Sequence, residues 1–234
     1  MNRTADAIIV GAGVIGSAVA FELAKRGYKT LNIDKLPTSG YGSTSNSCAI
    51  VRAHYSTWDG VAMAYEGFFY WDDWDNYIGV NDERGMIKYM KTGSIMFKLQ
   101  GEDHSSKSLK LFKEIGVEHE IWDLEKMKEM IPIYSHDQYD GTTRPDEDDH
   151  FWDKTGKKIE GAVYTPGSGY VSDPQLTSHN LQVAAEANGG EFLFNSEITE
   201  IKQQNGRVAG VTLKTGEQID SPILVNVAGP HSFV

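Results

Sequence analysis

The sequence predicts an α/β fold (α+β overall) in which a parallel sheet is interrupted by an inserted segment. The apolar run Ala7–Val10 has the length and composition of a buried parallel strand. Residues 14–26 repeat apolar side chains at helical spacing, and residues 29–33 form a second apolar run, which together make one βαβ unit. A comparable buried strand returns only near residue 222. The predicted sheet therefore starts and resumes at opposite ends of the sequence.

The inserted stretch begins with a loop and a long helix. Residues 37–49, PTSGYGSTSNSCA, are small and polar and predict a loop. Residues 58–78 predict one long helix. Residues 86–99 alternate around Gly93, which favours a β-hairpin.

Helices are also expected at 105–115 and 123–131, while the polar, acidic residues 134–160 are expected to be irregular. A further helix over 173–188 starts at a good N-cap, Asp173, followed by proline at the first helical position. Short strands are expected in EFLF, EITEIKQQ, RVAGVTLK and EQID, with Asn205–Gly206 as a hairpin turn.

Composition and charge restrict the class of protein. The 234 residues are enough for one or two domains with a real core. A net charge of -11 argues against nucleic acid or an anionic membrane as a partner, because both attract basic surfaces. The N-terminal apolar run is interrupted by glycines and then by charges, so neither a signal peptide nor a membrane span is expected. A single cysteine excludes an internal disulfide, and we expect a cytoplasmic protein.

A glycine motif, GAGVIG, follows the first strand and opens the first helix. Gly11 permits a tight turn, Gly13 lets the backbone approach a pyrophosphate, and Gly16 allows close packing of helix and strand. Asp34, 23 positions after Gly11, can accept hydrogen bonds from ribose hydroxyls. The motif predicts a Rossmann-like dinucleotide site. An NAD enzyme usually continues in βα units, so the interrupted layout favours a flavin and leaves an NAD(P)-linked oxidoreductase as the weaker alternative.

Four blocks of sequence together resemble one family. They are the glycine motif with Asp34, the loop GSTSNSCAIVRAHY, the segment VYTPGSGYVSDPQLTSHNLQVAAEANGGEFLFNSEITEI, and LVNVAGPHS. In this order they resemble the FAD-dependent glycine/D-amino acid oxidase (DAO) superfamily, and within it sarcosine oxidase and sarcosine/dimethylglycine dehydrogenase-like proteins. The resemblance covers nearly the whole chain but only the N-terminal portion of the family's length.

The resemblance implies FAD as the cofactor. The pyrophosphate would lie on the glycine motif, the ribose on Asp34, the adenine near Ile198, and the isoalloxazine near residues 42–49. Small residues suit such positions because main chain must come close to a flat cofactor. The implied cofactor-binding residues are Gly11, Gly13, Val14, Ile15, Gly16, Asp34, Lys35, Gly42, Ser43, Thr44, Ser45, Ser47, Cys48, Ala49, Ile198, Ala228 and Gly229.

Arg52 and Tyr55 are the implied catalytic residues. Arg52 corresponds to the arginine that binds the substrate carboxylate in such enzymes, a task that suits a planar fork of donors. A structural salt bridge is the alternative for Arg52, and packing is the alternative for Tyr55. The loop contains no histidine to which flavin could be attached, and Cys48 is expected to be a small buried thiol rather than a thioether.

No metal site is expected. The acidic segment containing Asp146, Glu147, Asp148, Asp149, His150 and Asp153 does not match a calcium-binding loop, so a solvated loop is the preferred interpretation.

The resemblance also predicts the domain organisation and the reaction. Residues 1–85 and 160–234 would form a discontinuous FAD-binding domain, and residues 86–159 would form part of an incomplete, inserted, β-rich substrate domain. The predicted enzyme oxidises the C–N bond of an amino acid or N-methylated amino acid by hydride transfer to flavin N5. The alternative is a non-catalytic FAD-binding subunit or fragment, and in either case a second chain or C-terminal half would complete the fold.

Overall fold

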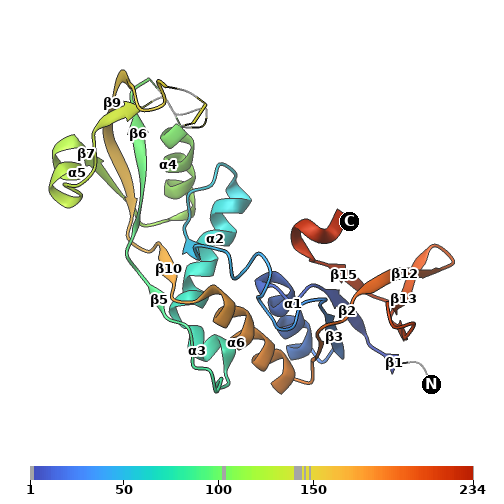
Figure 1. Ribbon diagram of the computed structural model, residues 1–234. Helices are drawn as coiled ribbons and strands as arrows, with labels where there is room; N and C mark the ends of the chain where they lie inside the picture. Colours follow the sequence, from blue (N-terminus) through green and yellow to red (C-terminus); the bar gives the residue numbers. More distant parts are fainter. Residues whose placement is uncertain (1–2, 102–103, 140–143, 145, 148, 234) are drawn as a thin grey trace. The chain divides into compact units, whose positions relative to one another are not determined.

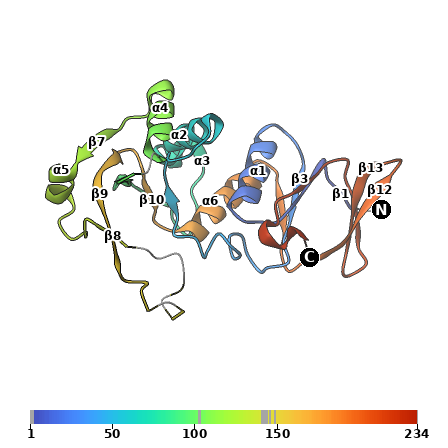
Figure 2. The same ribbon diagram turned by 90° about the horizontal axis from the view of Figure 1, so that it is seen from above.

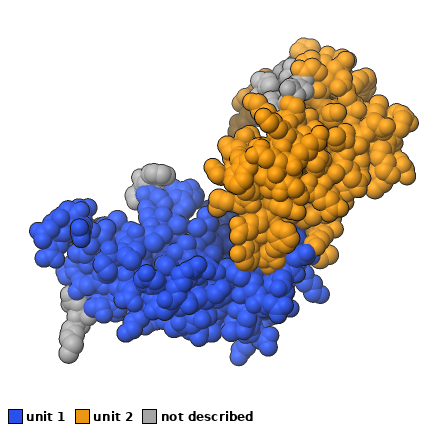
Figure 3. Space-filling view, turned by 180° about the vertical axis from the view of Figure 1, so that it is seen from behind, with its two compact units in different colours: residues 1–49, 72–89, 171–234 blue, residues 50–71, 90–170 orange. Residues whose placement is uncertain are grey.

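The computed structural model divides the chain into two compact units (Figures 1 and 3). It describes residues 3–101, 104–139, 144, 146–147 and 149–233. Unit 1 contains residues 1–49, 72–89 and 171–234, and unit 2 contains residues 50–71 and 90–170. None of the helices in these described ranges is long and apolar enough to span a membrane.

Unit 1 is built on a four-stranded parallel sheet with the strand order β11-β3-β2-β15. Its strands are β2 (Ala7–Val10), β3 (Thr30–Ile33), β11 (Glu191–Leu193) and β15 (Leu224–Asn226). The predicted βαβ unit is confirmed, with β2 and β3 joined by α1 (Val14–Lys25). Strands from the two ends of the sequence therefore lie side by side, as the buried apolar runs predicted.

Each face of this parallel sheet is covered. Helices α1 and α6 (Pro174–Ala187) lie beside each other on one face (Figures 1 and 2). A second sheet covers the other face, and Ile8 and Leu31 pack there against Val211 and Ile219. Its strands, in spatial order, are β1 (Arg3–Thr4), β14 (Gln218–Asp220), β13 (Arg207–Leu213) and β12 (Ile198–Gln204). Burial on both faces explains why the central strand β2 is apolar throughout.

Unit 2 is organised around one long strand, β9 (Lys154–Thr165), which pairs antiparallel with three others. These are β6 (Ser94–Leu99), β7 (Glu120–Asp123) and β8 (Asp137–Tyr139). A short sheet has the order β4-β10-β5, from β4 (Ile50–Val51), β10 (Gly169–Val171) and β5 (Tyr89–Met90). The helices are α2 (Trp58–Asp72), α4 (His104–Ile115) and α5 (Leu124–Met130). Val61 of α2, Phe112 of α4 and Val163 of β9 share one core.

Three sequence-based expectations differ from the structure. The long helix at 58–78 is two helices, α2 and α3 (Trp74–Ile78), and α3 ends at the left-handed Gly79. The expected hairpin at 86–99 is wrong, because β6 pairs with β9 and β5 lies in the sheet with β10. Residues 134–160 were expected to be irregular, but this range contains β8 and the polar first half of β9.

The boundaries of the compact units also differ from the expected domain boundaries. Residues 50–71 belong to unit 2 because α2 packs in the core formed by α4 and β9. Residues 160–170 belong there as well, since β9 continues without interruption to Thr165 and pairs with β6 over this range.

Candidate cofactor-binding site

The glycine turn after β2 is held at the carboxyl end of the parallel sheet. The Gly11 N–H donates to the Ile33 carbonyl at 2.8 Å, and Gly11 has a φ of 103°. A Cβ on Gly11 would lie 2.7 Å from the carbonyl oxygen of Val227 and 2.9 Å from Cα of Ala228. Only glycine combines this backbone conformation with such close approach. The turn therefore joins the ends of β2, β3 and β15.

Gly16 and Gly13 have different surroundings. A Cβ on Gly16 would overlap the carbonyl oxygen of Gly11, so the first turn of α1 rests directly on the glycine turn. Gly13 has an ordinary φ of -70°, and a Cβ there would meet only the Thr44 hydroxyl, at 3.1 Å. The protein's own packing thus requires glycine at position 16, whereas a Cβ at position 13 would crowd only one side-chain hydroxyl.

The N-terminus of α1 suits an anion. Gly13 is the N-cap residue of α1 and has no side chain that could cap the helix, and the first turn contains no acidic residue. The N–H of Val14 donates to Thr44 Oγ1 at 3.1 Å. N–H groups in the first turn of a helix lack intrahelical acceptors, and the helix dipole gives this end a partial positive charge. Phosphate groups bind at such ends.

Asp34 ties the end of β3 to the glycine turn. Its Oδ2 accepts from the Ala12 N–H at 2.7 Å, and its Oδ1 accepts from the Leu36 N–H at 2.9 Å. Its main-chain carbonyl accepts from the Ser196 N–H at 2.9 Å, which brings the segment before Ile198 alongside. An ionised carboxylate has about four acceptor positions, so each oxygen retains capacity for a further donor. Lys35, the next residue, is exposed.

The small-residue loop folds on its own main chain and returns to the glycine turn. The Gly40 N–H donates to the Ala12 carbonyl at 2.8 Å, and Ser45 Oγ donates to the Gly42 carbonyl at 2.9 Å. The Ala49 N–H donates to Ser47 Oγ at 3.0 Å. Together with the Thr44 contact described above, these bonds bring the loop beside the start of α1.

The turn after β15 lies against the same loop. Gly229 has a φ of 64°, and a Cβ there would be 4.0 Å from Ser43 Oγ. The Ala228 N–H donates to the Asn226 side chain at 3.2 Å. The turns after β2, β3 and β15 and the small-residue loop therefore meet at one edge of the sheet, where ligands bind in open α/β sheets.

Two apolar side chains of the predicted site, Cys48 and Ile15, are exposed to solvent. The expectation of a buried thiol at Cys48 is wrong, because the loop satisfies its own hydrogen bonds and leaves this side chain exposed to solvent. Ile15 is 63% exposed on α1. Val14 and Ile15 belong to an apolar groove of about 360 Å³ on this helix.

Arg52 and Tyr55 lie in unit 2, next to each other on the surface. The guanidinium carbon of Arg52 is 5.4 Å from the centre of the Tyr55 ring. Both side chains are exposed, and no carboxylate within the described ranges forms an ion pair with Arg52. The stacking leaves the planar guanidinium edge available for a bidentate anion.

His54 lies between these two residues and was not identified from the sequence. It is 9% exposed, and its Nε2 lies 3.3 Å from Thr165 Oγ1. Burial lowers the pKa of His54 to about 4, and the nearby charge of Arg52 acts in the same direction. The sequence around His54 carries no signal that predicts this burial, which comes from contacts with Phe112 and Thr165.

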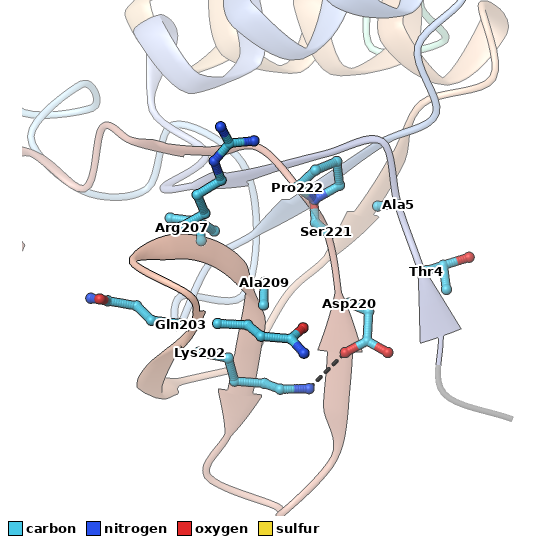
Figure 4. A pocket seen from close by; sticks show the side chains of 11 residues that line it. Thr4, Ala5, Lys202, Gln203, Arg207, Ala209, Asp220, Ser221 and Pro222 are labelled. Atoms are coloured by element: carbon cyan, nitrogen blue, oxygen red, sulfur yellow. Dashed lines mark hydrogen bonds and ion pairs between the residues drawn. The ribbon is translucent and has the colours of Figure 1, made fainter.

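Two other features do not belong to this edge of the sheet. A pocket of about 710 Å³ lies among β1, β12, β13 and β14, where Lys202 and Asp220 face each other 2.6 Å apart (Figure 4). None of the predicted site residues lines it. No group of side chains in the described ranges could hold a metal ion, and Asp148 of the acidic segment lies outside those ranges.

Comparison with known proteins gives a consistent match. The family "FAD dependent oxidoreductase" (DAO) matches residues 6–233. The pyruvate dehydrogenase phosphatase regulatory subunit of Mus musculus is 25% identical over 98% of this chain and 23% of its own length. The monomeric sarcosine oxidase of Streptomyces avermitilis is 24% identical over 85% of this chain and 45% of its own length.

Solved structures share the fold. L-proline dehydrogenase from P. horikoshii superposes with a TM-score of 0.78 at 20% identity, covering 98% of this chain and 54% of that one. Glycine oxidase from Geobacillus kaustophilus gives 0.73 at 22% identity, covering 97% and 56%. The chain thus spans about half the length of these structures and less than half of the curated relatives named above.

Proposed function

Because the chain belongs to the family of FAD-dependent oxidoreductases (DAO), we propose that it binds FAD for an enzyme that oxidises the C–N bond of an amino acid. The substrate class includes N-methylated amino acids, since the related proteins include sarcosine oxidase, glycine oxidase and proline dehydrogenase. The observation that carries this proposal is the start of α1, where Gly13 at the N-cap position has no side chain and only the Thr44 hydroxyl lies close to it.

The residues at the edge of the parallel sheet fit the adenosine diphosphate part of FAD. The pyrophosphate would lie on the turn from Gly11 to Gly16, against Val14 and Ile15 at the start of α1. It would accept from N–H groups of this turn other than those of Gly11 and Ala12, which already donate to Ile33 and Asp34. The free acceptor positions of Asp34 would receive the ribose hydroxyls, and Lys35 would add a positive charge nearby. Ile198 would contact the adenine, because the segment before it hydrogen-bonds to the main chain of Asp34.

The remaining cofactor residues would surround the flavin. They are Gly42, Ser43, Thr44, Ser45, Ser47, Cys48, Ala49, Ala228 and Gly229. Their small side chains and exposed hydroxyls allow main chain to approach a planar ring and hydrogen-bond to its polar edge. Bound FAD would supply a two-electron acceptor, at flavin N5, for the hydride on the carbon next to the substrate nitrogen. The resulting C=N bond is then hydrolysed by water.

Arg52 and Tyr55 would orient the substrate. The guanidinium would bind the carboxylate through two parallel hydrogen bonds, and the Tyr55 ring would hold the guanidinium plane in position. This assignment uses the exposed charge of Arg52, which forms no ion pair with a carboxylate in the part of the chain that the structure describes, and it does not require a titratable base in the same segment.

A non-catalytic FAD-binding subunit is the second candidate. The supporting observation is the match to a phosphatase regulatory subunit over 98% of this chain, at an identity similar to that of the sarcosine oxidase match. In this case this chain, with its FAD bound, would be a structural part of a complex with a further polypeptide. Both candidates share the cofactor site and differ in whether substrate reduces the flavin.

The distinguishing experiment starts from the purified protein that carries this chain. Visible flavin absorbance released by denaturation as FAD is expected for both candidates, and a colourless protein that binds no added FAD would refute both. Anaerobic addition of sarcosine, glycine or proline should bleach the flavin if the protein is an oxidoreductase of amino acids. Retained colour with all three would favour the non-catalytic subunit.

A further inference from the structure

A three-residue turn brings Arg52 and Tyr55 together. The Tyr55 N–H donates to the Ala53 carbonyl at 3.0 Å, which makes His54 the central residue of a γ-turn after β4. The turn reverses the chain, so that the exposed side chains on either side of it meet at 5.4 Å. The geometry of the Arg52–Tyr55 pair therefore depends on what holds residue 54.

His54 is fixed from two sides within unit 2. Its ring stacks on Phe112 of α4, with centres 5.5 Å apart and planes 26° from parallel, and Phe112 is fully buried. Its Nε2 faces Thr165 Oγ1 at the end of β9, 3.3 Å away. Stacking restrains the tilt of the imidazole, and the hydroxyl contact restrains its rotation. A side chain restrained in this way fixes the turn that carries it.

The hydroxyl partner is itself part of a fixed cluster. Thr165 Oγ1 lies 2.8 Å from Ser168 Oγ and 2.9 Å from Ser94 Oγ, and both Thr165 and Ser168 are fully buried. Because Ser94 and Thr165 are paired residues of β6 and β9, the cluster is anchored in the pairing of these two strands. The contact between Thr165 and His54 thus fixes the turn relative to the sheet.

We propose that His54 is a positioning residue that, through Thr165, holds the Arg52–Tyr55 pair in the geometry that binds a substrate carboxylate. This inference rests on the proposed function of Arg52 and adds a residue that holds Arg52 in position. A neutral imidazole suits the role, because a protonated one would repel the guanidinium two residues away. His54 remains neutral near pH 7, since burial and Arg52 lower its pKa to about 4.

The role predicts a loss of selectivity for carboxylates over amides. A displaced guanidinium fork loses its bidentate bond to a carboxylate, but it affects an uncharged amide much less. A general loss of folding would weaken both ligands equally. We therefore take as the readout the ratio of dissociation constants for glycinamide and glycine, which differ only in this group. Calorimetric titration of the full-length protein measures both, with the bound FAD reduced beforehand and oxygen excluded so that glycine cannot transfer a hydride.

Four variants test whether His54 and Thr165 hold the Arg52–Tyr55 pair in position. His54→Phe keeps the stacking and removes the nitrogen, while Thr165→Val removes the hydroxyl and Thr165→Ser retains it. Both His54→Phe and Thr165→Val should lower the ratio by about 5- to 10-fold, the size of one displaced polar contact. Thr165→Ser should restore it. Thr155→Val is the matched control, because Thr155 lies on the same strand and its hydroxyl donates to the Gln138 carbonyl at 3.0 Å instead.

Arg52→Met separates this inference from the proposed function. If Arg52→Met abolishes the preference for glycine while His54→Phe and Thr165→Val leave it unchanged, the positioning role is refuted and the role of Arg52 survives. If Arg52→Met has no effect, both are refuted. Should His54→Phe fail to fold, the Thr165→Val and Thr165→Ser pair still decides, since equal ratios in these two variants would refute the inference.

Discussion

Gly16 in the first turn of α1 packs directly on the carbonyl oxygen of Gly11 in the preceding turn, with no room for a Cβ between them. Gly16→Ala should therefore force helix and strand apart and lower the free energy of unfolding by about 2–3 kcal/mol, as overpacking usually does. Urea unfolding measures the change. Gly27→Ala is the control, since Gly27 has a φ of 84° but no atom within 4 Å of a Cβ. A Gly16→Ala variant no less stable than Gly27→Ala would contradict the packing role.

Gly13→Ala should separate cofactor binding from folding. The backbone of Gly13 has an ordinary φ, and a Cβ there would crowd only Thr44 Oγ1, at 3.1 Å. Because a small shift of this side chain relieves the contact, the free energy of unfolding should fall by no more than about 1 kcal/mol. The methyl group would instead occupy the space proposed for the pyrophosphate, and the dissociation constant for FAD should rise about 10-fold or more. Quenching of FAD fluorescence on binding measures it. Unchanged FAD affinity in Gly13→Ala would show that the pyrophosphate does not approach this residue.

Asp34→Ala should weaken FAD binding through two losses. The Ala12 and Leu36 N–H groups lose their acceptor, and the ribose hydroxyls lose theirs. A rise of about 10- to 100-fold in the dissociation constant is expected from hydrogen bonds to a charged group. Asp173→Ala is the control, because Asp173 in the same unit accepts from the Leu176 N–H as the N-cap of α6. It should cost stability without changing the FAD affinity of the folded protein.

The parts of this fold that could be predicted from sequence are those set by neighbouring residues. The βαβ unit follows from apolar periodicity and three glycines, and the start of α6 follows from Asp173 and Pro174, whose cap the structure contains. The hairpin around Gly93 was wrong because the true partner of β6 is β9, more than sixty residues away. Gly93 is required for a different reason, since a Cβ there would overlap the ring of Tyr164.

The site shows the same division. The glycine turn, Asp34 and the small-residue loop were predicted and lie together in unit 1. Residues 154–160 form part of a strand that the sequence does not predict. Its residues there, such as Lys154 and Lys158, are mostly exposed and polar, so the segment lacks the alternation of apolar and polar residues that is typical of a strand. His54 was missed because its burial depends on Phe112 and Thr165, which are distant in the sequence.

Asp82 should stabilise unit 1 in a pH-dependent manner. Its carboxylate is almost fully buried, accepts from Asn180 Nδ2 at 2.7 Å and pairs with His179 Nδ1 at 2.5 Å. Burial acts to raise the pKa of Asp82, but the bonds from His179, the Arg84 N–H and Asn180 outweigh it and lower the pKa below its usual 3.8. Stability from this group is therefore complete above about pH 4 and is lost as the pH falls through the lowered value.

Asp82→Asn tests this dependence. At pH 7 the variant should lose about 2 kcal/mol of unfolding free energy, because buried partners lose a charged acceptor. The difference in unfolding free energy from the natural protein should shrink as the pH falls below 4 and through the lowered pKa, because the carboxylate of Asp82 then becomes protonated and neutral like the amide. Asp123→Asn, an exposed helix cap in unit 2, is the control. A difference that stays constant down to pH 2 would rule out the ionised carboxylate as the source.

His54 should make the free energy of unfolding depend on pH between about 4 and 6.5, above the range in which Asp82 acts. Its folded pKa of about 4 is lower than the usual 6.5, so the unfolded chain binds the proton more readily between these values. Stability is therefore fully present above pH 6.5 and decreases as the pH is lowered toward 4. His54→Phe should flatten urea unfolding free energies over this interval. His119→Phe, whose ring also contacts Phe112 at 5.6 Å, should retain the slope. If His54→Phe keeps the full slope, the buried neutral imidazole is not its cause.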